Sequence, residues 1–379
     1  MRSFSFLIFV ALAFCCWGTY GPVLHIGQEA MGADGQLSSL RPFICVGIAY
    51  FMIAVLFPLI VLLTRGETGK WTLFGSAWSF AAGAVGAIGA LGIIFAFKFQ
   101  GKPVYVMPLV FGCAPIVNTF VTMAMARTFR QASLIFYVGI IIVAIGAAGV
   151  LTFKPTAPKK SAERIESQVE SVSESQIIPV VFSSQAENKS TNSPADQTAV
   201  TSTKPSVAKT AGNMMMIVHS VIVTAICWGA YGPVLHKGQT QMGGSRLRPF
   251  LCVGLAYFAI AVVVPYFLLP FFPEPGGWNT TGTVWSLMGG AVGAIGALGI
   301  IYAFNFGGKP IFVMPLVFGF APVVNTFVET ISKGMGQASP YFYASLLMVI
   351  VGAVMVLVFA PKAAPHKPAD NVYGKPATH

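Results

Sequence analysis

Long apolar stretches separated by short polar loops run through most of this chain. Ten of them have about the 20 residues that a helix needs to cross a bilayer. The longest polar stretch, 154–212, divides them into five plus five. The pattern predicts an all-α integral membrane protein with ten transmembrane helices. The predicted spans are 4–24, 42–64, 75–97, 104–126 and 133–153, then 216–236, 249–272, 281–304, 311–331 and 341–360.

The two groups of five spans repeat each other in sequence. The segment GKPVYVMPLVFGCAPIVNTFV at 101–121 returns as GKPIFVMPLVFGFAPVVNTFV at 308–328, with 17 of 21 positions identical. Because each half has an odd number of spans, the second half must enter the membrane from the opposite side. The sequence therefore predicts two inverted five-helix repeats, an arrangement typical of transporters.

The repeat also sets the predicted domain boundaries. The first 20 residues resemble a secretory signal, but FCCWGTYGPVLHIGQ at 14–28 returns as ICWGAYGPVLHKGQ at 226–239, where no signal peptide can lie. We therefore assign both segments to first helices of a repeat. The polar linker and tail are predicted to be disordered, because they are too polar to bury a core. The predicted divisions are a first repeat at 1–153, a linker at 154–212, a second repeat at 213–361 and a tail at 362–379.

Composition narrows the functional classes. The 379 residues are 55% hydrophobic and 9% charged, far from the roughly 25% charged residues of soluble domains. The net charge of +11 comes from Lys and Arg spread over short loops, which disfavours nucleic-acid binding. Their distribution predicts cytoplasmic N- and C-termini in the plasma (inner) membrane. The six cysteines lie in apolar segments without ligand spacing, and no catalytic motif occurs, so we expect no enzyme, cofactor or metal.

Prolines inside the repeated apolar segment point to a functional region. A proline within a helix removes one backbone hydrogen bond and frees the carbonyl four residues earlier. In a membrane such carbonyls must be satisfied by protein or must line a cavity. Broken apolar helices at matching places in two halves therefore predict a transporter binding site. The predicted hinge residues are Pro108, Pro115, Pro315, Pro322, Pro22 and Pro233.

The candidate substrate contacts are the polar and aromatic residues near these prolines. Asn118 and Asn325 each lie three residues after a proline, deep in an apolar span. Such an asparagine needs a hydrogen-bond partner, and the sequence leaves two alternatives: a group on another helix or the substrate. Aromatic residues at the start of these helices and in the two first helices would form walls. The predicted substrate-binding set is Asn118, Asn325, Tyr105, Phe312, Trp17 and Trp228.

Four further ionisable residues lie in or near spans. Lys98 is matched by an asparagine in the second half, which suggests a gating or anion-binding role. Glu329 is a candidate coupling carboxylate, although its place near a predicted helix end favours an interfacial group. His25 and His236 are predicted to be solvated helix ends.

Glycines and arginines recur at matching places as well. The third spans contain AGAVGAIGALGII at 82–94 and GGAVGAIGALGII at 289–301. We favour close helix packing over substrate contact for these glycines. Arg41 and Arg248 open the second spans and are predicted to be interfacial anchors.

Further motifs recur in order along both halves: Trp17-Gly18 and Trp228-Gly229, the Phe/Tyr-Ala-Phe steps at 95–97 and 302–304, Pro115 and Pro322, Gly139 to Gly149, and Gly352. Taken in order, these motifs resemble the drug/metabolite transporter superfamily, in its EamA-like or glucose/rhamnose-uptake-like branches. The resemblance implies ten helices in two inverted five-helix repeats, with both termini cytoplasmic. The chain departs from it in its 59-residue linker and in an acidic residue late in the fourth helix that only Glu329 matches loosely.

We therefore expect a secondary transporter that moves a small polar metabolite, such as a sugar or an amino acid, by alternating access. Its substrate would occupy a central cavity between the repeats. The expected partners are a small-molecule substrate and the lipid bilayer. Nucleic acid is not expected, and a homodimer is one of the alternatives left open for the oligomeric state. The alternative is a membrane scaffold or sensor, without transport, that binds a partner through its long linker.

Overall fold

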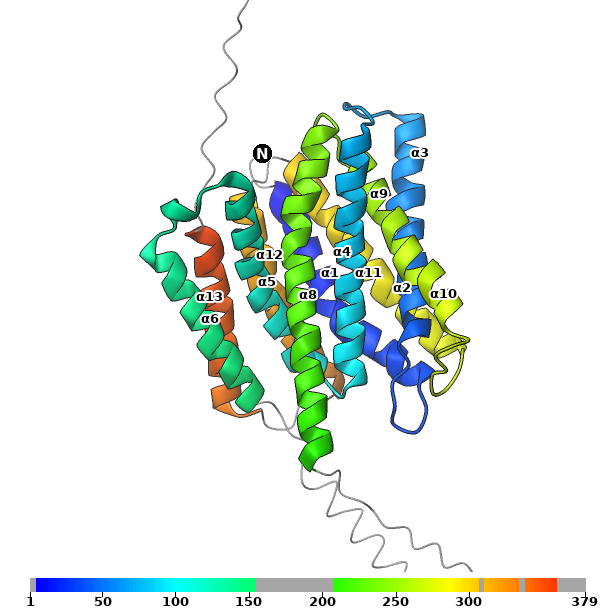
Figure 1. Cartoon of the computed structure of the whole chain (residues 1–379), viewed down its shortest axis with the longest axis vertical. Coiled ribbons are helices and arrows are strands. Elements are labelled where there is room, and N and C mark those ends of the chain that lie inside the picture. Colours follow the sequence, from blue (N-terminus) through cyan, green and yellow to red (C-terminus); the bar gives the residue numbers. More distant parts are fainter. Residues whose placement is uncertain (1–4, 154–206, 307–309, 334–337, 360–379) are drawn as a thin grey trace, which may run out of the picture.

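The computed structural model describes residues 5–153, 207–306, 310–333 and 338–359 (Figure 1). Every regular element in these ranges is a helix. Nine helices there are long and apolar enough to cross a membrane, and a further apolar helical stretch covers Leu316–Ser332. These helices indicate a multi-pass membrane protein. The linker from 154 to 206 and the tail from 362 lie outside the described residues.

The helix boundaries follow the predicted spans closely. The first helices of the two halves differ most: one continues beyond residue 24 to Met31, and the other runs from Val207 to Gln241, so residues 207–212 are helical although they were predicted as linker. The first half contains α1 (Ser5–Met31), α2 (Leu40–Phe51), α3 (Phe57–Thr64), α4 (Leu73–Lys98), α5 (Pro103–Ala126) and α6 (Leu134–Thr152). The second contains α8 (Val207–Gln241), α9 (Leu247–Phe258), α10 (Val264–Leu268), α11 (Thr280–Asn305), α12 (Pro310–Lys333) and α13 (Pro340–Val358).

The second span of each half is interrupted by a π-helical turn. One turn, Met52–Leu56, joins α2 to α3, and the other, Ala259–Val263, joins α9 to α10. Each turn ends two residues before a proline, Pro58 or Pro265. Because proline has no N–H and its ring clashes with a carbonyl of the preceding turn, the wider π turn accommodates it.

The predicted break in the fourth spans is wrong at the level of the backbone. Helix α5 runs without interruption through Pro108 and Pro115, and α12 is likewise one helix. Threonines follow the second proline of each: Thr119 Oγ1 donates to the carbonyl of Pro115 at 2.9 Å, and Thr326 Oγ1 donates to the corresponding proline carbonyl at 3.0 Å. Such local bonds bend a helix without ending it.

Helices of one half pack mainly on helices of the other. α1 lies against α11 and α12, while α8 lies against α4 and α5. α6 and α13 pair at one side of the bundle. In Figure 1, α1 begins and α8 ends at the upper end of the bundle, whereas α1 ends and α8 begins at the lower end. The terms upper end and lower end are used below in this sense.

The glycine stripes of α4 and α11 explain this close packing. A Cβ at Gly89 would overlap the ring of Trp228, and a Cβ at Gly296 would overlap the ring of Trp17. Only glycine leaves room for these indoles against the helix backbone. The expectation that the glycines serve helix packing is therefore confirmed.

Candidate functional site

Two tryptophans hydrogen-bond the first helix of each half to the third helix of the other half. Trp17 Nε1 on α1 donates to the carbonyl of Gly293 at 3.2 Å. Trp228 Nε1 on α8 donates to the carbonyl of Gly86 at 3.1 Å. Both side chains are half-buried. Each indole thus ties the first helix of one half to the third helix of the other.

An aromatic row connects these two tryptophans. The ring of Trp17 lies 6.5 Å from that of Phe318 on α12, and Phe318 lies 6.3 Å from Phe111 on α5. Phe111 in turn lies 6.1 Å from Trp228. These separations are within the range of favourable aromatic contacts. The row joins α1, α12, α5 and α8 across the middle of the protein.

Buried tyrosines lie next to this row. Tyr50 on α2 and Tyr257 on α9 stack with ring centroids 3.7 Å apart and planes within 1°. Tyr20 packs edge-on against Trp228 at 6.0 Å. Tyr20, Tyr50 and Tyr257 belong to one buried cluster, and Tyr231 packs against it.

The surroundings of these tyrosines leave hydrogen-bonding capacity unused. Tyr20, Tyr50 and Tyr257 are all buried, yet the hydroxyl of Tyr20 has no hydrogen-bond partner within the described part of the chain. The hydroxyls of Tyr50 and Tyr257 approach the backbone at Gly293 and Gly86, lying 3.1 Å from where a Cβ would stand. A buried polar group without a partner is costly unless water or a ligand supplies one.

Sequence reasoning missed these four tyrosines, although a signal was present. Tyr20 and Tyr231 occupy the same place in the repeated Trp-Gly-x-Tyr-Gly-Pro motif. Tyr50 and Tyr257 occupy the same place in the second spans. A polar group that recurs at matched positions of two apolar spans is a functional candidate, since intramembrane polar groups need partners.

The predicted asparagines lie between helices. Asn325 is fully buried, and its Nδ2 donates to the carbonyl of Pro103 at 2.9 Å. Its Oδ1 lacks a partner within the described residues. Asn118 is half-buried. Of the two roles predicted for these residues, Asn325 fulfils the interhelical one, and substrate contact stays a prediction for both.

Of the two residues predicted at the mouth of the fourth helices, Tyr105 has a described side chain, and it lies outside the aromatic row. Tyr105 is buried at the start of α5, and its hydroxyl donates to the carbonyl of Gln100 in the loop before that helix, at 3.2 Å. The side chain of Phe312 lies outside the described part of α12.

The predicted hinge prolines lie inside helices rather than at breaks. The prolines of this set whose side chains are described all lie within continuous α-helix. Their hinge role stays a prediction, and the side chain of Pro315 is outside the described part. The five others are Pro22 in α1, Pro108 and Pro115 in α5, Pro233 in α8 and Pro322 in α12.

Two ionisable residues differ from expectation in their burial. Glu329, for which an interfacial position was favoured, is only 3% exposed. His25, predicted as a solvated helix end, is 6% exposed, because α1 continues beyond it to Met31 and packs there. Its Nδ1 lies 3.2 Å from Glu29, one turn later. Lys98 is exposed, with its Nζ 5.9 Å from the centre of the Phe95 ring.

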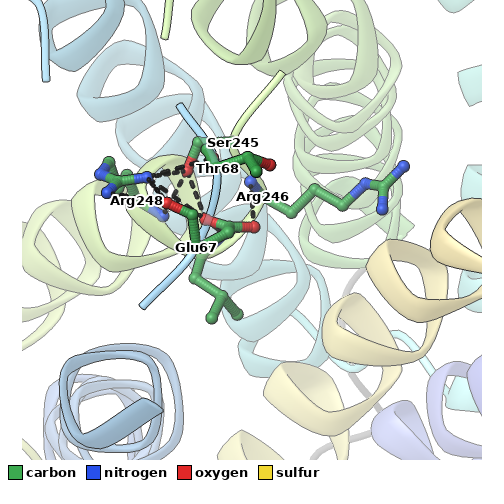
Figure 2. A network of polar contacts seen from close by, with 6 residues as sticks. Glu67, Thr68, Ser245, Arg246 and Arg248 are labelled. Atoms are coloured by element: carbon green, nitrogen blue, oxygen red, sulfur yellow. Dashed lines mark hydrogen bonds and ion pairs between the residues drawn. The ribbon is translucent and has the colours of Figure 1, made fainter. Parts of the chain in front are cut away.

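A carboxylate network at the upper end joins the two halves (Figure 2). Glu67, in the loop after α3, accepts hydrogen bonds from Ser245 Oγ at 2.5 Å, from Arg246 N at 2.9 Å and from Leu247 N at 3.3 Å. Arg248 pairs with the same carboxylate at 3.6 Å and donates to the Glu67 carbonyl. The carboxylate therefore caps the free N–H groups that begin α9. We call this network the upper clasp.

A matching network, the lower clasp, lies at the other end. Glu274, in the loop after α10, accepts from Ser38 Oγ at 2.8 Å, from Ser39 N at 2.9 Å and from Leu40 N at 2.8 Å. Arg41 donates to the Glu274 carbonyl at 3.4 Å. The arginines predicted as interfacial anchors thus bind the loop of the opposite half. Glu67 and Glu274 were missed because acidic loop residues usually face water, although they match at an offset of 207 residues.

No metal centre is evident in the described ranges, where no group of three or more His, Cys, Asp or Glu side chains is placed to hold an ion. All six cysteines are free thiols. The described side chains at the centre offer hydrogen bonding by tyrosine hydroxyls and contact with aromatic faces.

Comparisons with known proteins add little to this description. No protein-family model matches the chain, and no curated protein matches it. A solved structure described as "Crystal structure of protein" aligns with a TM-score of 0.49 and 14% identity, covering 95% of this chain and 99% of that chain. A likeness of this strength carries no argument about fold or function.

Proposed function

We propose that this chain is a secondary transporter of the drug/metabolite transporter superfamily, built from ten transmembrane helices in two inverted five-helix repeats. It moves a small polar metabolite across the plasma membrane by alternating access, with both termini in the cytoplasm. The observation that supports this most is the meeting of matched polar residues from both halves on one central site. Tyr20, Tyr50 and Tyr257 share one buried cluster there, against which Tyr231 packs, beside the aromatic row.

This arrangement suits a carrier better than a passive scaffold. Inverted-repeat transporters place the substrate near the bilayer midplane, at the interface of the repeats. Here that interface holds buried hydroxyl groups among aromatic rings, including that of Tyr20, which has no hydrogen-bond partner among the described residues. A scaffold would be more stable with apolar residues at these positions, because unpaired buried polar groups destabilise the fold.

A ligand screen tests the proposal. Purified protein in mild detergent is heated with sugars, amino acids, nucleosides and amines. A ligand at about 100 times its dissociation constant stabilises the folded state by about 2.7 kcal/mol, which raises the unfolding temperature measurably. The expected result is at least one stabilising class whose effect is lost in the Tyr50→Phe, Tyr257→Phe double variant. A hit that survives the double variant contradicts the site.

The linker provides the control for the scaffold alternative. Residues 160–205 lie outside the described helices, so their deletion leaves α8 intact from Val207. A carrier keeps ligand stabilisation after this deletion. A protein that acts only through its linker shows no ligand class at all, and it loses its partner when the linker is removed.

A further inference from the structure

A lysine near the end of α8 is held over an aromatic ring of α4. Lys237 lies one turn before the last residue of α8, and its Nζ is 4.1 Å from the centre of the Trp78 ring. Both side chains are half-buried. An ammonium group over an indole face is attracted by the charge distribution of the ring. The contact therefore fixes the charge of Lys237 at the boundary between α8 and α4.

A second lysine lies at the same corner of the protein. Lys70 is exposed in the loop before α4, and its backbone N–H donates to the carbonyl of Met242 at 3.1 Å. Thr72 Oγ1 donates to the carbonyl of Gln241, also at 3.1 Å. Gln241 follows Lys237 by about one helical turn. The two lysines thus meet at the upper end, where α4 begins beside the end of α8 (Figure 1).

Acidic side chains do not balance the charge of this corner. Within the described ranges, neither Lys70 nor Lys237 forms an ion pair. Glu67 is the acidic residue in the loop that holds Lys70, but its carboxylate caps the start of α9 and pairs with Arg248 (Figure 2). The two ammonium groups are therefore available to an anion from outside the chain.

An exposed apolar surface continues from this corner along the helices. On α4, Phe74 lies one turn before Trp78 and is 73% exposed, and Ile88, on the same side, is 41% exposed. On α8, Ile226 lies about three turns before Lys237 on the same face and is 52% exposed. On a membrane-spanning helix such apolar side chains contact lipid tails. Positive charge thus lies directly next to a lipid-facing surface.

The matched corner at the lower end lacks the two lysines. The tryptophan is kept there, but both positive charges and the phenylalanine are replaced by uncharged, smaller or aliphatic residues. The repeat therefore forms this helix pair without them, so the fold does not require them. The matched pairs are Trp78 and Trp285, Lys237 and Ile26, Lys70 and Gly277, and Phe74 and Thr281.

We propose that the corner of Lys70, Lys237, Trp78 and Phe74 is a binding site for one anionic phospholipid. The lipid phosphodiester lies between the two ammonium groups, and an acyl chain lies along the apolar surface of α4 and α8. Lysine binds phosphate as a point charge, and basic pockets between membrane helices bind anionic headgroups. The site is distinct from the central tyrosines and does not depend on transport.

A comparison of two lipids tests the site on the unmodified full chain. Protein in mild detergent is titrated with phosphatidylglycerol or phosphatidylcholine in mixed micelles. The unfolding midpoint is measured, and native mass spectrometry counts the lipids that stay bound. Phosphatidylglycerol should raise the midpoint and stay bound as one molecule at mole fractions where phosphatidylcholine does neither, because a ligand of the folded state stabilises it. Equal effects of the two lipids overturn the proposal.

A soluble anion is the alternative occupant, and the same measurement separates it from a lipid. Glycerophosphoglycerol has the phosphatidylglycerol headgroup without acyl chains, and inorganic phosphate has the anion alone. Both should leave the midpoint unchanged at concentrations equal to that of the lipid. A shift as large as that of phosphatidylglycerol overturns the lipid assignment, because the acyl chain would then contribute nothing.

Two matched double variants locate the site. Lys70→Gln with Lys237→Gln should raise the amount of phosphatidylglycerol needed for half of the shift by about tenfold or more, since both ammonium groups are lost. Arg127→Asn with Arg130→Gln is the control: these exposed residues lie between α5 and α6 at the same end, and Asn tolerates the φ of 55° at position 127. The control should keep the wild-type half-point.

Each result of this pair decides the location. An equal loss in both double variants indicates unspecific attraction to a positive surface and overturns the site. An unchanged response in the lysine variant overturns it as well. The wild-type comparison of the two lipids needs no substitution, so the inference is tested even if the lysine variant does not fold.

Discussion

Removing the carboxylate of the upper clasp should destabilise the protein substantially. The Glu67 side chain is 18% exposed and accepts from one hydroxyl and two backbone N–H groups while pairing with Arg248. Loss of a helix cap costs about 0.5–2 kcal/mol, and a hydrogen bond to a charged group contributes about 1.5–3 kcal/mol. Arg248 keeps its bonds to the carbonyls of Glu67 and Thr68 in the variant, so these terms are not all lost.

We therefore expect Glu67→Ala to lower the free energy of unfolding by about 2–4 kcal/mol. The measurement is an SDS titration in mild detergent, followed by tryptophan fluorescence. Glu67→Gln keeps the shape and one acceptor oxygen, so it should lose about half as much. Glu274→Ala should lose a similar amount, because the lower clasp makes the same hydrogen bonds from one hydroxyl and two backbone N–H groups.

Asp34→Asn is the matched control. Asp34 is an exposed loop residue with a φ of 53°, a conformation that asparagine tolerates. It removes the same charge and should change stability by less than about 0.5 kcal/mol. A loss in Glu67→Ala no larger than that of Asp34→Asn would refute the reasoning about the clasp.

Three further substitutions test the packing and the centre. Gly296→Ala should lower the unfolding midpoint, because its Cβ overlaps the indole of Trp17, while Gly212→Ala, in open space, should not. Tyr50→Phe should keep the fold and weaken ligand stabilisation, whereas Tyr266→Phe, on the exposed face of α10, should leave both unchanged. Asn325→Ala should cost about 1–3 kcal/mol in the same titration, since a buried carbonyl loses its donor; an unchanged midpoint would contradict the interhelical bond.

Much of the helical framework was predictable because it depends on local composition. The apolar spans have membrane-crossing length, and the duplicated Trp-Gly and Gly-Ala segments meet each other in the structure as matched contacts. The proline prediction failed because a proline bends a helix only as far as its neighbours allow. Pro108 and Pro115 stay within one helix, while Pro58 and Pro265 are accompanied by π turns.

The centre was less accessible to sequence reasoning. The stack of Tyr50 on Tyr257 joins residues 207 positions apart, and the local sequence around each tyrosine does not predict that the two rings meet. His25 is buried whereas the matched His236 is exposed, and this difference could not be predicted from the repeat, because the two motifs are nearly identical.

The most direct test of the transport proposal is uptake of the stabilising ligand into proteoliposomes that contain the full chain. Wild-type protein should give saturable uptake, and the Tyr50→Phe, Tyr257→Phe double variant should lose most of it while Tyr266→Phe keeps it. Uptake no greater than in empty liposomes, from protein that still binds the ligand, would contradict the central claim.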